Sequence, residues 1–196
     1  MKPTMCVILA FGDRVNSVSP INKGLLNFAI QKCREFEIKK IVIQKEACIP
    51  KGNNESPLPA LYQVSGIKKK KEYDVVLIED PVKYLDTWGF LLLAEKECRP
   101  DNGDFVGQVL VICHLSHKNR VETSCKRVPI FSNAIILSPT WIGFDKKSIQ
   151  KYTRTKFRWY LREIFWALPG YKIMWMLQDF FGGKIPKIFL ALRERK

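Results

Sequence analysis

Five short apolar runs rich in valine and isoleucine constrain the fold of this chain most strongly. Each is about as long as one β-strand, and its apolar residues are consecutive instead of alternating, which is typical of strands buried on both faces. The runs are Met5–Phe11, Lys40–Gln44, Asp74–Glu79, Gln108–Cys113 and Ala134–Leu137.

Helical patterns separate several of these runs. Leu25, Leu26, Ala29 and Cys33 recur at helical spacing before the second run, and Trp88–Glu97 precedes the fourth. Alternating strands and helices favour a parallel sheet whose right-handed crossover helices cover both faces. We therefore predict an α/β fold, a Rossmann-like three-layer sandwich with a mainly parallel sheet, plus carboxyl-terminal amphipathic helices.

The composition suits one domain that needs no disulfide or structural metal to fold. The chain has 196 residues, of which 46% are hydrophobic, so it can bury a core without disulfides or metals. Its six cysteines are scattered, without a CxxC pair, which predicts reduced thiols and a cytoplasmic protein. No signal peptide or spanning helix is expected. We expect residues 1–150 to form the Rossmann-like core and residues 151–196 to add a basic, aromatic-rich helical extension packed on the same domain.

Polar residues follow the apolar runs and form the first group of candidates. Ligands of parallel sheets bind beyond the carboxyl ends of the strands, so side chains there can meet in one cleft. The alternative is that each strand simply ends in a polar loop. The candidates are Gly12 and Asp13 after the first run, Glu55 and Ser56 in a Pro- and Gly-rich loop, and Glu79 at the end of the third run.

The segment after the fourth run carries the sharpest local pattern. It contains His114, Ser116, His117 and Arg120, and a helix is expected to follow the strand. His117 and Arg120 would share one face of the first helical turn, where free N–H groups favour an anion. An imidazole and a guanidinium there could hold a phosphate or assist its transfer, although a purely structural surface pair is the alternative.

Metal and cofactor motifs are weak or absent in the sequence. Cys113, His114 and His117 could ligate a metal, but no second cluster at zinc-like spacing accompanies them. The sequence has no GxGxxG, no P-loop and no GxSxG. We therefore predict neither a metal nor a cofactor.

The order of several motifs resembles the YdcF-like family, which includes the SanA and ElyC envelope proteins. The pieces that carry the resemblance are Glu79-Asp80-Pro81 through Asp86-Thr87, His117-Lys118-Asn119-Arg120-Val121, and Tyr160-Leu161-Arg162-Glu163-Ile164. This resemblance implies a Rossmann-like domain whose cleft binds an anionic small molecule, such as a nucleotide or a phosphorylated precursor, in an envelope-related role. It adds Thr87 to the candidate ligand-binding residues. Whether the chain is an enzyme stays open. If it is one, phosphoester or phosphoanhydride chemistry is expected, in which Arg120 would neutralise charge, His117 would transfer a proton, and Glu79 or Glu55 would position water.

The carboxyl-terminal quarter offers an alternative function. From residue 146 onward there are thirteen basic residues against three acidic ones, interleaved with aromatic side chains. Such helices could simply cover the sheet, or they could bind the inner face of an anionic membrane, as in a peripheral membrane or assembly protein. Nucleic acid is a third and less favoured partner, because no recognition motif is present. The oligomeric state is left open, and the membrane-facing candidates are Arg158, Trp159, Arg162 and Trp166.

Overall fold

The computed structural model describes residues 2–12, 18–44, 72–78, 87–98, 107–148 and 151–167. The chain divides into two compact units, Met1–Thr155 and Lys156–Lys196. All of the described strands belong to the first unit, and the described part of the second unit is the helix α4 (Lys156–Ala167).

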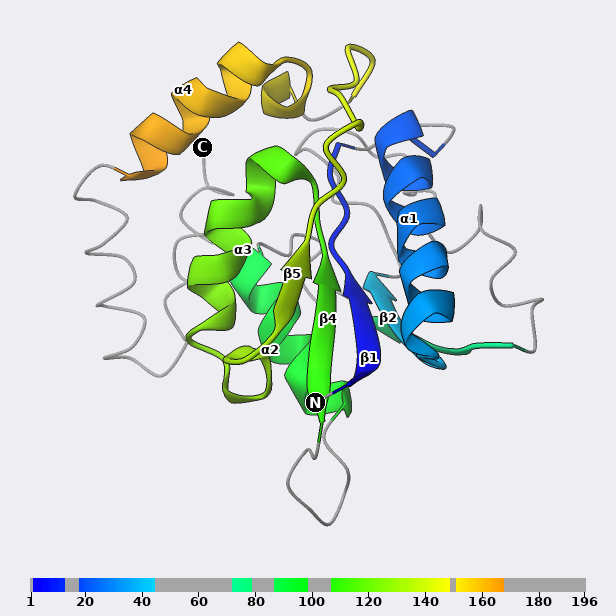
Figure 1. The fold of residues 1–196 in the computed structure, drawn as a ribbon. Helices are drawn as coiled ribbons and strands as arrows, with labels where there is room; N and C mark the ends of the chain where they lie inside the picture. The colour runs from blue at the N-terminus through cyan, green and yellow to red at the C-terminus, as the bar shows by residue number, and fades with distance from the viewer. Residues whose placement is uncertain are drawn as a thin grey trace. The chain divides into compact units, whose positions relative to one another are not determined.

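A five-stranded parallel sheet forms the centre of the first unit (Figure 1). Its spatial order is β3-β2-β1-β4-β5, and all four pairings between neighbours are parallel. This confirms the predicted α/β, Rossmann-like sheet. The strands are β1 (Pro3–Ile8), β2 (Lys40–Gln44), β3 (Asp74–Ile78), β4 (Gln108–Ile112) and β5 (Ile135–Leu137).

The central strands are buried on both faces, which explains their continuous apolar sequences. Val7 of β1 is in register with Val42 of β2 and Val111 of β4, and all three are fully buried. Successive side chains of a strand point to opposite faces, so Cys6 and Ile8, the neighbours of Val7 in β1, lie on the other face of the sheet. They are fully buried as well.

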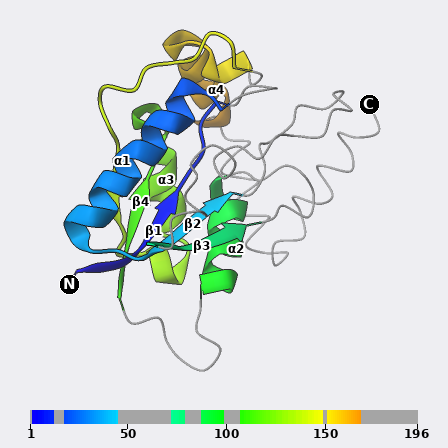
Figure 2. The ribbon, with the colours of Figure 1, turned by 90° about the vertical axis from the view of Figure 1, so that its right-hand side faces the viewer.

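Helix α1 (Pro20–Phe36) covers one face of the sheet (Figure 2). The side chain of Ser19 caps its first turn by accepting a hydrogen bond from the backbone N–H of Asn22, and Pro20 occupies the first turn, where no N–H is needed. Glu37 ends the helix in the left-handed conformation, with φ 58°. Its buried side chains include Leu25, Leu26, Ala29 and Cys33.

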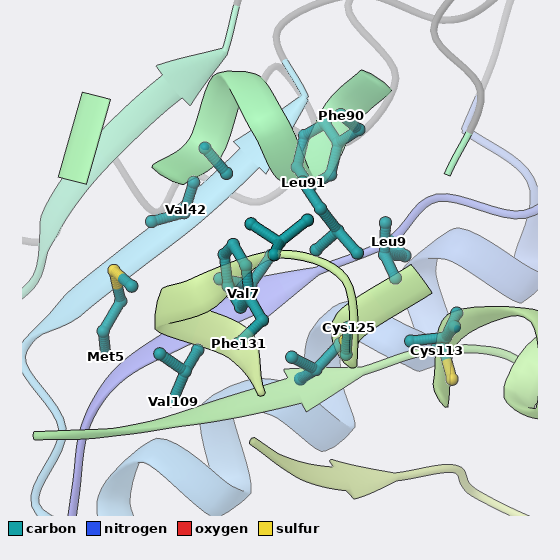
Figure 3. Close-up of a cluster of buried hydrophobic side chains, with 14 of the residues drawn as sticks. Met5, Val7, Leu9, Val42, Phe90, Leu91, Val109, Cys113, Cys125 and Phe131 are labelled. Atoms are coloured by element: carbon teal, nitrogen blue, oxygen red, sulfur yellow. The ribbon is translucent and has the colours of Figure 1, made fainter. Parts of the chain in front are cut away.

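Helices α2 (Thr87–Cys98) and α3 (Lys118–Cys125) pack together on the other face. Phe90 and Leu91 from α2 and Cys125 from α3 join one buried cluster with the strand residues Val7 and Val109 (Figure 3). The amino-terminal ends of α2 and α3 are therefore held at the same face and the same edge of the sheet.

The strand order reverses between β1 and β4. Strands β2 and β3 lie on one side of β1, whereas β4 and β5 lie on the other. In open α/β sheets the carboxyl ends of the two strands at this switch point form the usual ligand crevice. The segments that follow β1 and β4 therefore border the position where such a crevice would lie.

Candidate functional site

Two aromatic rings meet directly beyond the switch point. Leu9 continues the pairing of β1 with β4 by donating its backbone N–H to the carbonyl of Ile112 at 2.9 Å. The rings of Phe11 and His114 then stack with centroids 4.1 Å apart and an interplanar angle of 8°. The carboxyl ends of these two strands are thus joined by a ring stack.

Both ring nitrogens of His114 are hydrogen-bonded to backbone groups. Its Nδ1 accepts the backbone N–H of Ser116 at 3.2 Å, which caps the short 3-10 turn η2 (Leu115–His117). Its Nε2 lies 3.1 Å and 3.2 Å from the carbonyl oxygens of Ile142 and Gly143, so Nε2 carries the proton and donates to both. Burial lowers the pKa of His114, and the two carbonyls oppose this only in part. His114 is therefore a neutral, structural imidazole with no ring nitrogen left for a ligand.

The segment after β5 folds back over this stack. Phe144 packs edge-on against the ring of His114, with centroids 5.1 Å apart, and against Phe11 at 6.0 Å. Ile142 lies against α1, where a Cβ added to Gly24 would come within 2.8 Å of the Ile142 Cδ1. Packed aromatic rings and backbone groups therefore fill the space directly beyond the switch point, where the ligand crevice of such sheets usually lies.

Gly12, a predicted ligand-binding residue, has a packing role in this structure. Its φ is +70°, a conformation that residues with a side chain rarely adopt. A Cβ added there would lie 3.0 Å from Oγ1 of Thr153 and 3.4 Å from Oγ of Ser148, two hydroxyls that hydrogen-bond to each other at 2.7 Å. The absence of a side chain at Gly12 thus lets the segment around Ser148 and Thr153 approach the end of β1.

Asn22 fixes the connection between β1 and α1. Its Oδ1 accepts the backbone N–H of Phe11 at 2.8 Å, and the residue is fully buried. Asn22 was not among the predicted residues, although a polar residue three and four positions before Leu25 and Leu26 on an apolar helix face could have identified it. The ring cluster of Phe11 and Phe144 was not predicted either, and the sequence offers no comparable pattern for it.

The structure brings together two predicted site residues, Thr87 and His117. Thr87 is the first residue of α2, and His117 immediately precedes α3. Thr87 Oγ1 and His117 Nε2 lie 2.7 Å apart, and both residues are 8% exposed. The hydroxyl can donate to Nε2 or accept from it, depending on which nitrogen carries the proton. This bond connects the amino-terminal ends of two helices on one face of the sheet.

Arg120 and Ser116 flank His117 along the chain. Arg120 lies in the first turn of α3, three residues after His117, and is partly exposed. Ser116 is partly exposed in η2, where its backbone N–H is used by His114. The ring of His117 also packs against Phe11, with centroids 5.9 Å apart. A guanidinium, an imidazole and a hydroxyl thus belong to neighbouring segments beyond the strands.

Four of the predicted residues of the cleft lie outside the described residues. They are Asp13, Glu55, Ser56 and Glu79.

A metal site is not assembled within the described part of the chain. No group of three histidine, cysteine, aspartate or glutamate side chains there could hold an ion. Cys113 Sγ lies 3.2 Å from the hydroxyl of Ser138, and burial raises the pKa of its thiol to about 11. Cys113 is therefore a protonated thiol at neutral pH.

All four membrane-facing candidates belong to α4, and the side chains of three of them are described. Arg158 is exposed, whereas Trp159 is only 1% exposed. The guanidinium carbon of Arg162 lies 5.4 Å from the ring centroid of Trp159. The side chain of Trp166 lies outside the described residues. Trp159 therefore does not face outward, and the exposed apolar residues of α4 are different ones.

Comparisons of the chain with protein-family models, with curated proteins and with solved structures gave no match. Within the ranges that the structure describes, none of the helices has both the length and the apolar character needed to span a bilayer.

Proposed function

We propose that this chain binds an anionic small molecule, a nucleotide or a phosphorylated precursor, beside the amino-terminal ends of α2 and α3. The observation that carries the proposal is the 2.7 Å contact between Thr87 and His117. This contact joins the hydroxyl of the first residue of α2 to the imidazole of the residue that precedes α3, beside the aromatic cluster that fills the switch point. The motif order that resembles the YdcF-like family favours the same class of ligand.

The electrostatics of this edge suit an anion. Helix amino-terminal ends carry a partial positive charge, and α2 and α3 both begin here. The backbone N–H groups of His117 and Lys118 already bond to the carbonyls of His114 and Leu115, so the charge of this end and the side chains would hold the anion. Arg120 adds a permanent positive charge in the first turn of α3. A phosphate group is the natural partner, because a guanidinium can bind two of its oxygens at once.

His117 is the group suited to proton transfer in this site. An imidazole can accept or donate a proton near neutral pH, and Thr87 fixes the orientation of the ring. His114 does not compete for this role, since its nitrogens are bound to the backbone. Any turnover of a phosphoester or phosphoanhydride would therefore depend on His117, with Arg120 neutralising charge.

A thermal-shift screen tests the binding step. The panel contains inorganic phosphate, nucleoside mono- and diphosphates, and sugar phosphates. A ligand at 100 times its Kd adds about 2.7 kcal/mol to the free energy of unfolding, which corresponds to a rise in Tm of about 5–10 °C for a chain of this size. A panel without any shift at millimolar concentration would contradict the proposal.

Matched variants then locate the site. Arg120→Gln should weaken binding of the best ligand at least tenfold, whereas Arg127→Gln, an exposed residue just after the same helix, should not. Thr87→Val removes the hydroxyl that bonds to His117 and should weaken binding of the same ligand. Thr87→Ser keeps a hydroxyl at this position and should retain the affinity of the wild type. Equal affinities for the Arg120 and Arg127 variants would place the ligand elsewhere.

A further inference from the structure

Helix α4 carries an exposed apolar stripe. Phe157 is 71% exposed, Tyr160 51%, Leu161 40% and Ile164 60%. Their spacing of three, four and seven residues places them on one face of the helix. Four large apolar side chains in one row differ from the single exposed apolar residues that are normal on protein surfaces.

This stripe is not the buried face of the helix. Trp159 is 1% exposed and lies about 150° around the helix from the centre of the stripe, at 100° per residue. Among the described side chains of α4, residues 156–164, Trp159 is the buried one, so the side of the helix that carries Trp159 is the packed side. The row of Phe157, Tyr160, Leu161 and Ile164 is therefore a second apolar face.

Positive charges border the stripe on both edges. Lys156 lies on one side, with its Nζ 5.8 Å from the ring centroid of Tyr160. Arg158 is exposed and lies about 100° from Phe157 on the other side. Glu163 is the one acidic residue in the sequence of α4.

We propose that α4 lies flat on an anionic lipid surface, with the stripe at the boundary between head groups and acyl chains and the cations among the lipid phosphates. Apolar and aromatic residues flanked by lysine and arginine are typical of helices that bind this interface. A nucleic acid would contact the cations and could stack bases on Phe157 and Tyr160, but it would leave the aliphatic Leu161 and Ile164 in water. The formal net charge of +14 adds long-range attraction to an anionic surface. The twelve residues of α4 span about 18 Å, too short to cross a bilayer.

Cosedimentation of the full chain with vesicles tests this inference independently of the small-molecule site. Vesicles of phosphatidylcholine with phosphatidylserine are compared with vesicles of phosphatidylcholine alone. Binding should require phosphatidylserine, and the double variant Phe157→Gln with Ile164→Gln should bind at least tenfold more weakly. Both residues are exposed, so the variant should keep the unfolding midpoint of the wild type. Trp141→Gln is the matched control, because Trp141 is an equally exposed apolar residue of the first unit, at 67%.

A second pair of variants tests the charges. Removing Lys156 or Arg158 by substitution with glutamine should weaken binding about fivefold each at low salt. Equal binding to both vesicle types, or unchanged binding by the Phe157 and Ile164 variant, would contradict the proposal. A wild-type chain that stays in the supernatant with both vesicles would also contradict it and would assign the stripe to a protein surface.

Discussion

The neutral state of His114 predicts a particular pH dependence of stability. The folded chain holds this imidazole between the ring of Phe11 and two backbone carbonyls, with its Nδ1 already accepting a hydrogen bond. A second ring proton would have no acceptor at Nδ1 and would displace the N–H of Ser116. Burial accordingly lowers the pKa of His114 in the folded chain below its ordinary value.

The sign and the size of the effect follow from proton linkage. Between the lowered folded pKa and the unfolded pKa of about 6.5, the unfolded chain binds more protons at this site. The contribution of His114 to stability is therefore complete above pH 6.5 and is lost as the pH falls toward the folded pKa. The slope approaches about 1.4 kcal/mol per pH unit for this one group.

Urea unfolding of the wild type and of His114→Gln between pH 7.5 and pH 5 measures this slope as the difference between the two proteins, which cancels the groups they share, His117 included. His114→Gln removes the titrating ring and should be less stable than the wild type at pH 7.5 by about 1–3 kcal/mol, since buried hydrogen bonds are lost. The difference between the two proteins should shrink as the pH falls. Parallel stability curves, with a constant difference from pH 7.5 to pH 5, would refute the assignment of a neutral His114.

Two further predictions concern the segment after β1, and urea unfolding tests both. Gly12→Ala should lower the free energy of unfolding by about 1–3 kcal/mol, because alanine is strained at φ +70° and its Cβ would crowd the Thr153 hydroxyl. In the control Gly143→Ala nothing lies within 4 Å of the added Cβ, so the loss of stability should be clearly smaller. Equal losses in the two variants would contradict the packing role of Gly12. Asn22→Ala should lower the free energy of unfolding by about 1–3 kcal/mol, because the buried N–H of Phe11 loses its acceptor. The control Asn27→Ala, on the exposed side of α1, should stay within about 0.5 kcal/mol of the wild type. A similar loss of stability in both variants would contradict the role of Asn22.

The sheet could be predicted because its strands are buried on both faces. Lys40–Gln44 forms β2 with the predicted bounds, and the other strands begin or end within a few residues of their apolar runs. The first run was predicted to continue to Phe11, whereas β1 ends at Ile8. Apolarity cannot mark this end, because Phe11 is buried in the ring cluster instead of the sheet.

The candidate site could be predicted only in part. Thr87 and His117 were both named, but their hydrogen bond joins residues 30 positions apart and depends on α2 and α3 sharing one face. The structural role of His114 could not be inferred, because its partners Ile142 and Gly143 reach it only when the segment after β5 folds back. In α4 the sequence shows two apolar faces, and periodicity alone does not say that Trp159 belongs to the buried one.

NMR spectra of the two imidazole rings can test anion binding at His117 and the neutral state of His114 together, because the chain has only two histidines. The spectra are recorded while inorganic phosphate or adenosine monophosphate is added at constant ionic strength. We expect the ring signals of His117 to shift and to saturate as the ligand is added, and we expect Arg120→Gln to weaken this response. The signals of His114 should keep the pattern of a neutral ring protonated at Nε2. Signals of His117 that stay unchanged at millimolar concentrations of both ligands would contradict an anion site beside Thr87 and His117.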